Sequence, residues 1–460
     1  MDPIIKLVLV PDLSTVVGTA DPERVTYWLR EVALPGDRSR ALARLSADEL
    51  TALARFAATD DAVELLDSVD DELAARFLRA AEADDAVRLL DALDSDRVAD
   101  ILRELKGAPR QRILDLLPAQ RADRIRGLLS WPQDSAAAHM VPEMLTVSPG
   151  VTVAEAIAMV RAEANALRTD ARTGAYVFIV DDDARLGGVV GFRDLVLAEP
   201  ETPVDALADT DVRTVNALDD AEDAARALDA YDLVAVPVID EHGRLLGIVT
   251  EDDAADIAEE EATEDAERQG GSSPLDVPYL RASPLLLWRK RIVWLLLLFV
   301  AEAYTGTVLR AFEDEMEAVV ALAFFIPLLI GTGGNTGTQI TTTLVRAMAT
   351  GQVRLRDVPA VLVKELSTGS MVALTMALAA VIRAWTLGVG PEITLTVALT
   401  VAAIVMWSSL ISSILPPLLK KIRVDPALVS APLIATIVDG TGLIIYFMIA
   451  HATLSQLQGL

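Results

Sequence analysis

The second part of this 460-residue sequence contains five apolar stretches, and each is long enough to cross a lipid bilayer as a helix. They cover approximately residues 292–310, 316–345, 359–384, 393–419 and 426–450. In hydrocarbon a backbone satisfies its hydrogen bonds only in helices or closed barrels. We therefore expect residues 289–460 to form a transmembrane domain of five helices.

The sequence before these stretches has a very different charge. Residues 1–288 contain 58 acidic and 28 basic residues, whereas residues 289–460 contain 10 and 12. This break predicts water-soluble domains followed by a membrane domain. The strong negative charge argues against nucleic acid as a partner. Cysteine is absent, which excludes disulfides and thiolate metal sites.

Lysine is scarce, with 6 lysines against 34 arginines. An acidic protein with little lysine is typical of halophiles that accumulate salt, because carboxylates and net charge maintain solubility. We therefore expect a halophilic source.

Basic residues mark one side of the membrane. They precede the first apolar stretch (Arg289-Lys-Arg), lie between the second and third (346–356) and separate the fourth from the fifth (Lys420-Lys-Ile-Arg). By the positive-inside rule these ends face the cytoplasm. The opening apolar run, residues 4–10, is too short for a signal peptide. We expect a multi-pass protein of the cytoplasmic membrane, with its amino terminus inside and its carboxyl terminus outside.

Residues 20–130 show helical periodicity and a near-repeat. Asp61-Ala-Val-Glu-Leu-Leu-Asp recurs 24 residues later as Asp85-Ala-Val-Arg-Leu-Leu-Asp. Short amphipathic helices stacked in a superhelix fit this pattern. We assign residues 1–135 to such an all-α domain.

Residues 141–200 and 201–258 look like two copies of one α/β unit. The strand-like runs include Tyr176-Val-Phe-Ile-Val in the first copy and Leu233-Val-Ala-Val-Pro-Val-Ile in the second. The pattern resembles a tandem pair of CBS domains, which are regulatory modules. In some of them, residues placed as Thr250 and Asp253 hold the ribose of an adenine nucleotide. The first copy has Gly191 where the hydroxyl should be, which argues against a nucleotide site there, and ATP is the weaker alternative ligand.

Residues 251–268 contain ten acidic side chains. We predict a long charged helix here, within an acidic connecting segment at residues 251–285 that leads to the membrane.

Asp439 lies near the middle of the last apolar stretch, which contains no basic residue. Such a carboxylate is a functional site by default, and it lies roughly 20 Å along a helix that starts at Pro426. Pro432 should free a carbonyl near position 428 from its helical donor. Carbonyls and a carboxylate form the oxygen-only environment that Mg²⁺ or Ca²⁺ prefers. A protonated Asp439, hydrogen-bonded inside the bundle, is the alternative.

The second apolar stretch contains a polar, glycine-rich segment, Pro327-Leu-Leu-Ile-Gly-Thr-Gly-Gly-Asn-Thr-Gly-Thr-Gln. It predicts a break in the helix that lines a wet cavity. The alternative is close helix packing through the GxxxG spacing of Gly333 and Gly337. Packing does not require the polar groups of Asn335 and Gln339.

Together the two membrane motifs resemble the MgtE family of magnesium channels, and the likeness extends over nearly the whole chain. The resemblance implies a homodimer whose pore lies on the twofold axis, with Asp439 of both subunits facing one hydrated Mg²⁺. It also implies a selectivity region, which includes Gly333, Gly334, Asn335 and the Ala435 carbonyl, and a cytoplasmic pore mouth near Asp425.

Two positions depart from the family pattern. Ala431 replaces an asparagine that relatives often carry, which removes a side-chain ligand at that level. Glu302 lies outside the motif, and three readings stay open: it faces the cavity, pairs with Arg310 or is protonated.

In this family, intracellular Mg²⁺ binds between the helical domain, the CBS pair and the connecting helix, and closes the pore. Acids on separate domains repel one another, and a divalent ion that bridges them favours the compact closed state. The matching positions are Asp96, Asp100, Asp220, Glu222, Asp232, Asp253, Asp256, Glu261, Glu264 and Asp265. Each of them is alternatively a solvated surface charge.

We therefore predict a multidomain Mg²⁺ channel that performs no covalent chemistry and is closed by cytoplasmic Mg²⁺. It would comprise an all-α superhelical domain, α/β tandem CBS domains, a connecting helix and five transmembrane helices. A channel for Mn²⁺, Co²⁺ or Ni²⁺ is one alternative. A membrane-anchored CBS nucleotide sensor is another.

Overall fold

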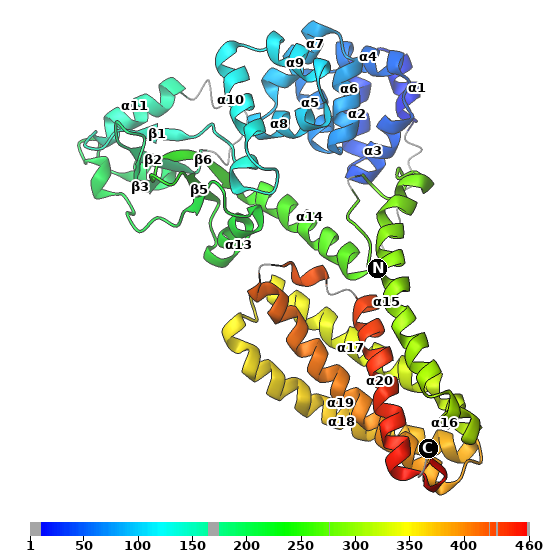
Figure 1. Ribbon diagram of the computed structural model, residues 1–460. Coiled ribbons are helices and arrows are strands. Elements are labelled where there is room, and N and C mark those ends of the chain that lie inside the picture. Colours follow the sequence, from blue (N-terminus) through cyan, green and yellow to red (C-terminus); the bar gives the residue numbers. More distant parts are fainter. Residues whose placement is uncertain (1–10, 164–173, 276, 423, 429–430, 458–460) are drawn as a thin grey trace, which may run out of the picture. The chain divides into compact units, whose positions relative to one another are not determined.

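The computed structural model describes residues 11–163, 174–275, 277–422, 424–428 and 431–457. They belong to two units, Met1–Glu259 and Glu260–Leu460, which we describe one at a time (Figure 1). The opening apolar run and Ser430, which precedes Ala431, lie outside the described residues.

The first unit begins with short helices. They are α1 (Leu13–Gly18), α2 (Pro22–Glu31), α3 (Pro35–Arg44), α4 (Ala47–Phe56), α5 (Thr59–Asp67), α6 (Asp71–Ala80), α7 (Ala83–Ala92), α8 (Ser95–Glu104), α9 (Ala108–Leu116) and α10 (Ala119–Ser130). Helices α4, α6, α8 and α10 pack in succession, and α5, α7 and α9 form a second row (Figure 1). The predicted stack of short helices is confirmed.

The 24-residue near-repeat places equivalent side chains in the core of this stack. In each helix the buried positions are the alanine and the two leucines of the repeated motif: Ala62, Leu65 and Leu66 in α5, and Ala86, Leu89 and Leu90 in α7. Burial of this apolar stripe is the main stabilising contribution, because helices of about ten residues are marginal on their own.

Arginines at the same spacing join successive helices. Arg97 donates to the carbonyls of Leu66 and Val69, and Arg121, 24 residues later, donates to those of Leu90 and Leu93. These carbonyls lie at or just after helix ends, where no helical donor remains. The planar guanidinium can serve two acceptors, which lysine does less well.

Two sheets with the same topology follow within the described part of the first unit. In the first sheet, β1 (Leu145–Val147) pairs parallel with β2 (Tyr176–Val180), which pairs antiparallel with β3 (Leu186–Gly191). In the second, β4 (Val215–Asn216), β5 (Ala235–Ile239) and β6 (Leu245–Thr250) repeat this arrangement. The accompanying helices are α11 (Val153–Glu163), α12 (Phe192–Leu197) and α13 (Ala221–Tyr231). The predicted pair of similar α/β units is confirmed.

Helix α14 (Glu251–Gln269) follows directly after β6 and crosses the boundary between the two units. It ends where Gly270 and Gly271 follow, and Gly271 adopts a φ of 73° that favours glycine. Helix α14 therefore accounts for residues 251–269 of the acidic connecting segment.

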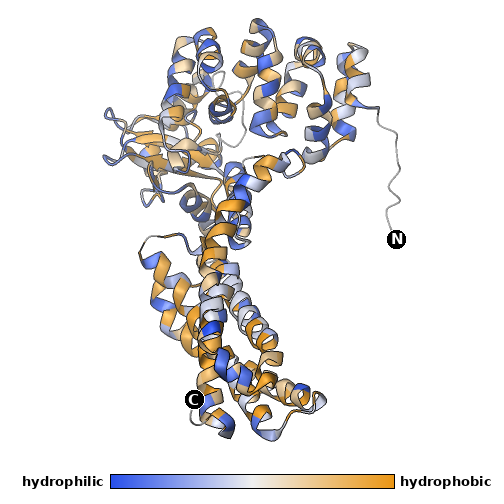
Figure 2. Ribbon diagram, turned by 45° about the vertical axis from the view of Figure 1, so that its right-hand side comes forward, coloured by the Kyte–Doolittle hydropathy of each residue, from blue (hydrophilic) through white to orange (hydrophobic). Residues whose placement is uncertain are grey.

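The second unit consists of long apolar helices (Figure 2). They are α15 (Pro284–Ala311), α17 (Ile326–Ala349), α18 (Val358–Thr386), α19 (Pro391–Lys421) and α20 (Ala431–Thr453), with the short helix α16 (Glu313–Ala318) after α15. In the described part of the chain, five helical segments are long and apolar enough to span a membrane: Pro284–Ala311, Val320–Ala349, Leu355–Thr386, Pro391–Lys421 and Ala431–Thr453. The expected transmembrane domain of five helices is confirmed.

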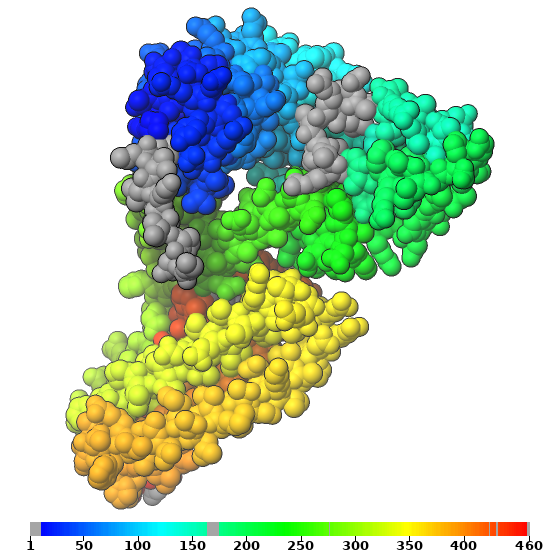
Figure 3. Space-filling view, turned by 180° about the vertical axis from the view of Figure 1, so that it is seen from behind, coloured from blue at the N-terminus to red at the C-terminus, as the bar shows by residue number. Residues whose placement is uncertain are grey.

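Helices α17, α19 and α20 form the centre of the second unit, and α18 packs on α19 at its outer face (Figure 3). The core contains Ile404 of α19 with Val438, Tyr446 and Phe447 of α20. The Tyr446 hydroxyl donates to the Leu322 carbonyl at 3.0 Å, so its polar end is satisfied.

The predicted break in the second apolar stretch is wrong, because α17 runs through the glycine-rich segment without interruption. A Cβ on Gly333 would lie 2.6 Å from both Ile404 and Val438, and one on Gly337 would meet Ile434 and Ser408. These glycines therefore permit close packing of α17 on α19 and α20. The packing alternative explains Gly333 and Gly337.

Pro432 was expected to free a carbonyl near position 428 within the last helix. Among the described residues, α20 begins at Ala431, so Leu428 lies before this helix and Pro432 lies in its first turn, where proline removes no N–H that the helix needs.

Candidate ion path and acidic clusters

Asp439 lies on α20, roughly 12 Å from the start of that helix. Its side chain is half-buried, and one carboxylate oxygen, Oδ1, is buried without a hydrogen-bond partner. Among the described residues no basic side chain forms an ion pair with it. A carboxylate in this position is suited to a cation that arrives from outside the chain.

The seam between α17 and α20 brings together several predicted pore residues. A Cβ on Gly334 would lie 3.3 Å from the Cβ of Ala435 and 3.8 Å from Asp439 Oδ1. Gly333 and Gly334 are buried, whereas the next residue, Asn335, is exposed. The glycines thus bring α17 against the turn of α20 that carries Asp439, and they leave the Asn335 amide accessible.

Asp425 precedes α20, and both of its carboxylate oxygens have partners. Oδ1 accepts from the backbone N–H of Ala427 at 2.8 Å, and Oδ2 accepts from Arg268 Nη1 at 3.1 Å. The other end of the Arg268 guanidinium contacts Glu264 Oε2 at 2.5 Å. Arg268 therefore connects the last turn of α14 to the residue expected at the pore mouth.

Sequence reasoning missed Arg268. It is the one basic residue in the acidic run 251–268, and that isolation was the available signal.

In the first unit, acids on α8 lie close enough to acids on α14 for their charges to interact. Burial raises the pKa of Asp96 well above its ordinary value, and repulsion from Asp253, Asp100 and Asp94 adds to this effect. Burial likewise raises the pKa of Asp100 to about 7, with further repulsion from Asp71, although the ion pair of Asp100 with Arg103 acts in the opposite direction. The structure therefore brings Asp96, Asp100 and Asp253 into one electrostatic cluster.

Asp253, in the first turn of α14, is the residue through which that helix joins the cluster. Burial raises its pKa to about 7, although a hydrogen bond from Thr250 acts in the opposite direction. The Arg97 charge acts on both Asp100 and Asp256, which places Asp256 at the edge of the same face. In the part of the chain that the structure describes, no three acidic or histidine side chains converge closely enough to hold one metal ion. A hydrated ion that lowers the repulsion fits this spacing better than a chelated one.

Three other predicted sensors have local structural roles. The Asp220 side chain accepts from the Glu222 N–H at 3.0 Å at the start of α13, and Glu222 pairs with Arg226 at 2.7 Å. Asp232 ends the same helix at a φ of 52°, where aspartate is better tolerated than most residues.

The remaining sensors on α14 are Glu261, Glu264 and Asp265, and all three belong to the second unit. Glu264 pairs with Arg268, and the other two also take part in interactions. A sensing role for these three residues stays a prediction.

Thr250 and Asp253, the residues matched to nucleotide binding, bond to each other. Thr250 is 1% exposed, and its hydroxyl contacts Asp252 and Asp253, at 2.6 Å in each case. The Asp253 carboxylate also accepts from the Thr250 backbone N–H at 3.3 Å, so it is bonded twice to the residue that precedes α14.

Glu302 is exposed on α15 and forms no ion pair with Arg310 or with any other described residue. Of the three readings left open for it, pairing with Arg310 is thereby removed.

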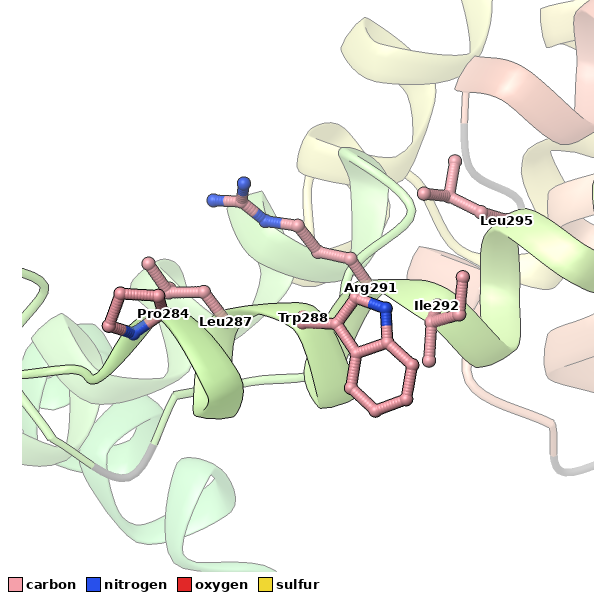
Figure 4. A pocket seen from close by; sticks show the side chains of 6 residues that line it. All are labelled: Pro284, Leu287, Trp288, Arg291, Ile292 and Leu295. Carbon is pink, nitrogen blue, oxygen red and sulfur yellow. The ribbon is translucent and has the colours of Figure 1, made fainter.

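A groove of about 350 Å³ lies on the first turns of α15 (Figure 4). Its lining comes from that helix alone: Pro284, Leu287, Trp288, Arg291, Ile292 and Leu295. The Trp288 indole and the Arg291 guanidinium extend to different sides of the helix. Tryptophan beside arginine is typical of a membrane–water interface, so we assign this groove to lipid contact rather than to the ion path.

Comparison with known proteins places this architecture in one family. The MgtE family, described as divalent cation transporters, matches residues 326–449, its intracellular N domain matches residues 34–134, and a CBS domain matches residues 204–260. The magnesium transporter MgtE of Thermus thermophilus is 41% identical over 330 residues, which are 72% of each chain. The magnesium transporter MgtE of Bacillus subtilis is 33% identical over 334 residues, again 72% of each chain.

Among solved structures, the cytosolic domain of the Mg²⁺ channel MgtE in complex with ATP is 31% identical. It covers 54% of this chain and 99% of that one, with a TM-score of 0.48. The sequence matches, which extend over the helical, CBS and membrane regions, show that this chain belongs to the MgtE family of divalent cation transporters.

Proposed function

We propose that this protein is a channel for Mg²⁺ in the cytoplasmic membrane and that cytoplasmic Mg²⁺ closes it. Its relatives from Thermus thermophilus and Bacillus subtilis are named magnesium transporters, which favours Mg²⁺ as the substrate. The observation that carries the proposal is Asp439, a carboxylate within a membrane helix that has a buried, unpartnered oxygen and no basic partner in the described chain.

The chemistry of Mg²⁺ suits a site with so few protein ligands. This ion loses its water reluctantly and keeps an octahedral shell. In a homodimer with the pore on the twofold axis, the two Asp439 carboxylates would hold the hydrated ion through its waters. The exposed Asn335 amide lies where it can contribute a further polar group, and Asp425 would stand at the cytoplasmic mouth.

Closure by Mg²⁺ would act on the cluster of Asp96, Asp100 and Asp253. Without a cation these carboxylates repel one another across α8 and α14, and a divalent ion removes that repulsion. Asp256, Glu261, Glu264 and Asp265 would extend the acidic surface along α14. The state with these elements packed together would then be favoured at high cytoplasmic Mg²⁺.

By the positive-inside rule, the basic ends of the helices favour an orientation with the amino terminus in the cytoplasm and the carboxyl terminus outside. ATP is a weaker candidate ligand, because the Thr250 hydroxyl is buried and bonded within the chain.

Purified protein in liposomes tests the proposal through Mg²⁺ uptake. Asp439→Ala should abolish Mg²⁺ flux while size-exclusion chromatography still detects the dimer. Competition by Mn²⁺, Co²⁺ and Ni²⁺ in the same assay would rank the divalent alternatives. Wild-type flux from the Asp439→Ala dimer would remove the pore assignment.

Isothermal titration of the whole protein with Mg²⁺ and with ATP separates the channel from the nucleotide sensor. ATP binding without Mg²⁺ binding would favour the sensor.

A further inference from the structure

Glu302 is a carboxylate within a membrane helix, and it has no basic partner among the described residues. It is the nineteenth residue of α15, it is exposed, and no described residue forms an ion pair with it. An ionised carboxylate that faces lipid is strongly disfavoured, so such residues face the bundle interior or a watery path.

The packing of α15 on α20 locates this charge beside Asp439. Gly440, the next residue after Asp439, lies directly against the Tyr304 ring, and a Cβ on it would be 3.3 Å from the Thr305 hydroxyl. Glu302 lies three residues before Thr305, and therefore on the same face and about one turn earlier. The two helices run in the same direction (Figure 1), so Glu302 lies near the level of Asp439.

Thr305 provides an independent sign that this seam is polar. It is 5% exposed, and its hydroxyl has no hydrogen-bond partner. Thr307, two residues later, instead donates to its own helix at the Ala303 carbonyl, at 3.0 Å. A buried hydroxyl without a partner is unfavourable, and water or a hydrated ion beside Asp439 would satisfy it.

The charges of the two carboxylates act on each other. Glu302 is the charged group that acts on Asp439, and it has the same sign. Two neighbouring negative charges without a basic partner attract a divalent cation more strongly than a monovalent one, because the attraction scales with the charge of the ion.

We propose that Glu302 is a further specificity-determining residue of the ion path, which concentrates divalent cations at Asp439 and disfavours monovalent ones. This inference rests on the proposed function, because it assigns Glu302 to the same path as Asp439.

Flux measurements on the full-length protein in liposomes test the role of the negative charge of Glu302. Glu302→Gln should raise the Mg²⁺ concentration for half-maximal uptake about tenfold and increase competition by K⁺. Glu302→Asp should stay close to wild type, because it retains the carboxylate. Glu317→Gln, which removes an exposed charge from α16, is the matched control and should change neither quantity.

A second measurement tests access to water and does not depend on flux. The chain contains no cysteine, so Glu302→Cys introduces a unique thiol. A water-soluble thiosulfonate reagent should label it, and Mg²⁺ should slow the labelling. The anionic adduct should restore the preference for Mg²⁺ over K⁺, whereas the cationic adduct should block uptake.

The outcomes separate this inference from the proposed function. If the wild type carries no Mg²⁺, the proposed function fails. If the wild type conducts and Asp439→Ala does not, but Glu302→Gln behaves as the wild type, then only the role of Glu302 fails. A thiol at position 302 that is inaccessible to the water-soluble reagent would also overturn it, since it would indicate a neutral residue facing lipid or protein.

Discussion

Acidic side chains occur in both units of this protein, but their surroundings differ. In the first unit most acids have a local partner, such as Arg226 for Glu222 or the α13 backbone for Asp220. In the membrane unit, Asp439 and Glu302 have no basic partner among the described residues. A charge in a membrane helix therefore points to function at once, whereas in the acidic unit only a carboxylate that is buried against others of its kind stands out.

Removing charge from the buried cluster should give the largest effect. Asp96→Asn combined with Asp253→Asn removes most of the repulsion that Mg²⁺ would relieve, so the closed state should be favoured even without the ion. We expect the flux in the absence of cytoplasmic Mg²⁺ to fall about a hundredfold, toward the inhibited level of the wild type. Liposomes with graded Mg²⁺ on the cytoplasmic side measure it.

Matched controls come from the acids with structural roles. Glu222→Gln and Asp232→Asn should leave the inhibition unchanged, because Glu222 has a salt bridge and asparagine tolerates the Asp232 backbone conformation. A shift of equal size in these controls would mean that net charge, rather than burial, controls closure.

The close packing of α17 on α19 and α20 predicts the next largest effect, which is a loss of stability. Gly337→Ala would press a methyl group against Ile434 and Ser408, and we expect a loss of about 2 to 3 kcal/mol in stability. Gly331→Ala, on the same helix with open space around it, should be neutral or stabilising. Thermal unfolding in detergent compares them, and equal midpoints would contradict close packing as the reason for glycine.

These glycines also mark the limit of prediction from the sequence. Length and hydropathy were sufficient for the five membrane helices, and the near-repeat was sufficient for the helical stack, because both patterns are local. The glycine-rich segment was wrongly read as a broken helix, since composition does not distinguish a helix that breaks from one that packs closely. Ile404 lies 71 residues from its neighbour Gly333, and Ile434 lies 97 residues from its neighbour Gly337, so a local pattern does not reveal either contact.

The candidate site was predictable to a similar degree. Asp439 stood out because it is charged in an apolar stretch. The sequence alone did not distinguish the acids predicted to sense Mg²⁺ from other surface acids. Whether an acid is buried against α8 or paired with Arg226 depends on the tertiary fold.

The stability of the first unit should decrease as the pH rises toward 7. Asp100 and Asp253 each have a folded pKa of about 7 and an unfolded pKa near 4. The folded state therefore binds more protons between about pH 4 and pH 7, so stability should fall as the pH rises through this window. We expect a loss of about 1 to 2 kcal/mol.

Hydrogen exchange of α8 in the intact protein would detect this loss. Mg²⁺ added at pH 7.5 should restore protection in α8 and leave the distant helix α2 unaffected. Protection of α8 that rises with pH in the absence of Mg²⁺ would contradict the raised pKa values.

The Arg268 contacts predict the smallest effect, because both of its ion pairs are partly exposed and such pairs contribute less than about 1 kcal/mol. Arg268→Gln should change the inhibitory Mg²⁺ concentration only a few-fold. The direction is informative: if the guanidinium holds α14 against Asp425 in the closed channel, then more Mg²⁺ is needed for closure once it is removed.

A double-mutant cycle with Asp425→Asn decides whether loss of the Arg268–Asp425 ion pair causes the change in the inhibitory Mg²⁺ concentration. If Arg268 acts through Asp425, the double variant should resemble either single variant, because the same ion pair is lost only once. Additive effects would mean that Arg268 acts through Glu264 alone and that Asp425 serves only the passing ion. The cycle thus tests whether Asp425, an acid of the second unit, acts through a basic partner within the chain, as Glu222 does in the first unit.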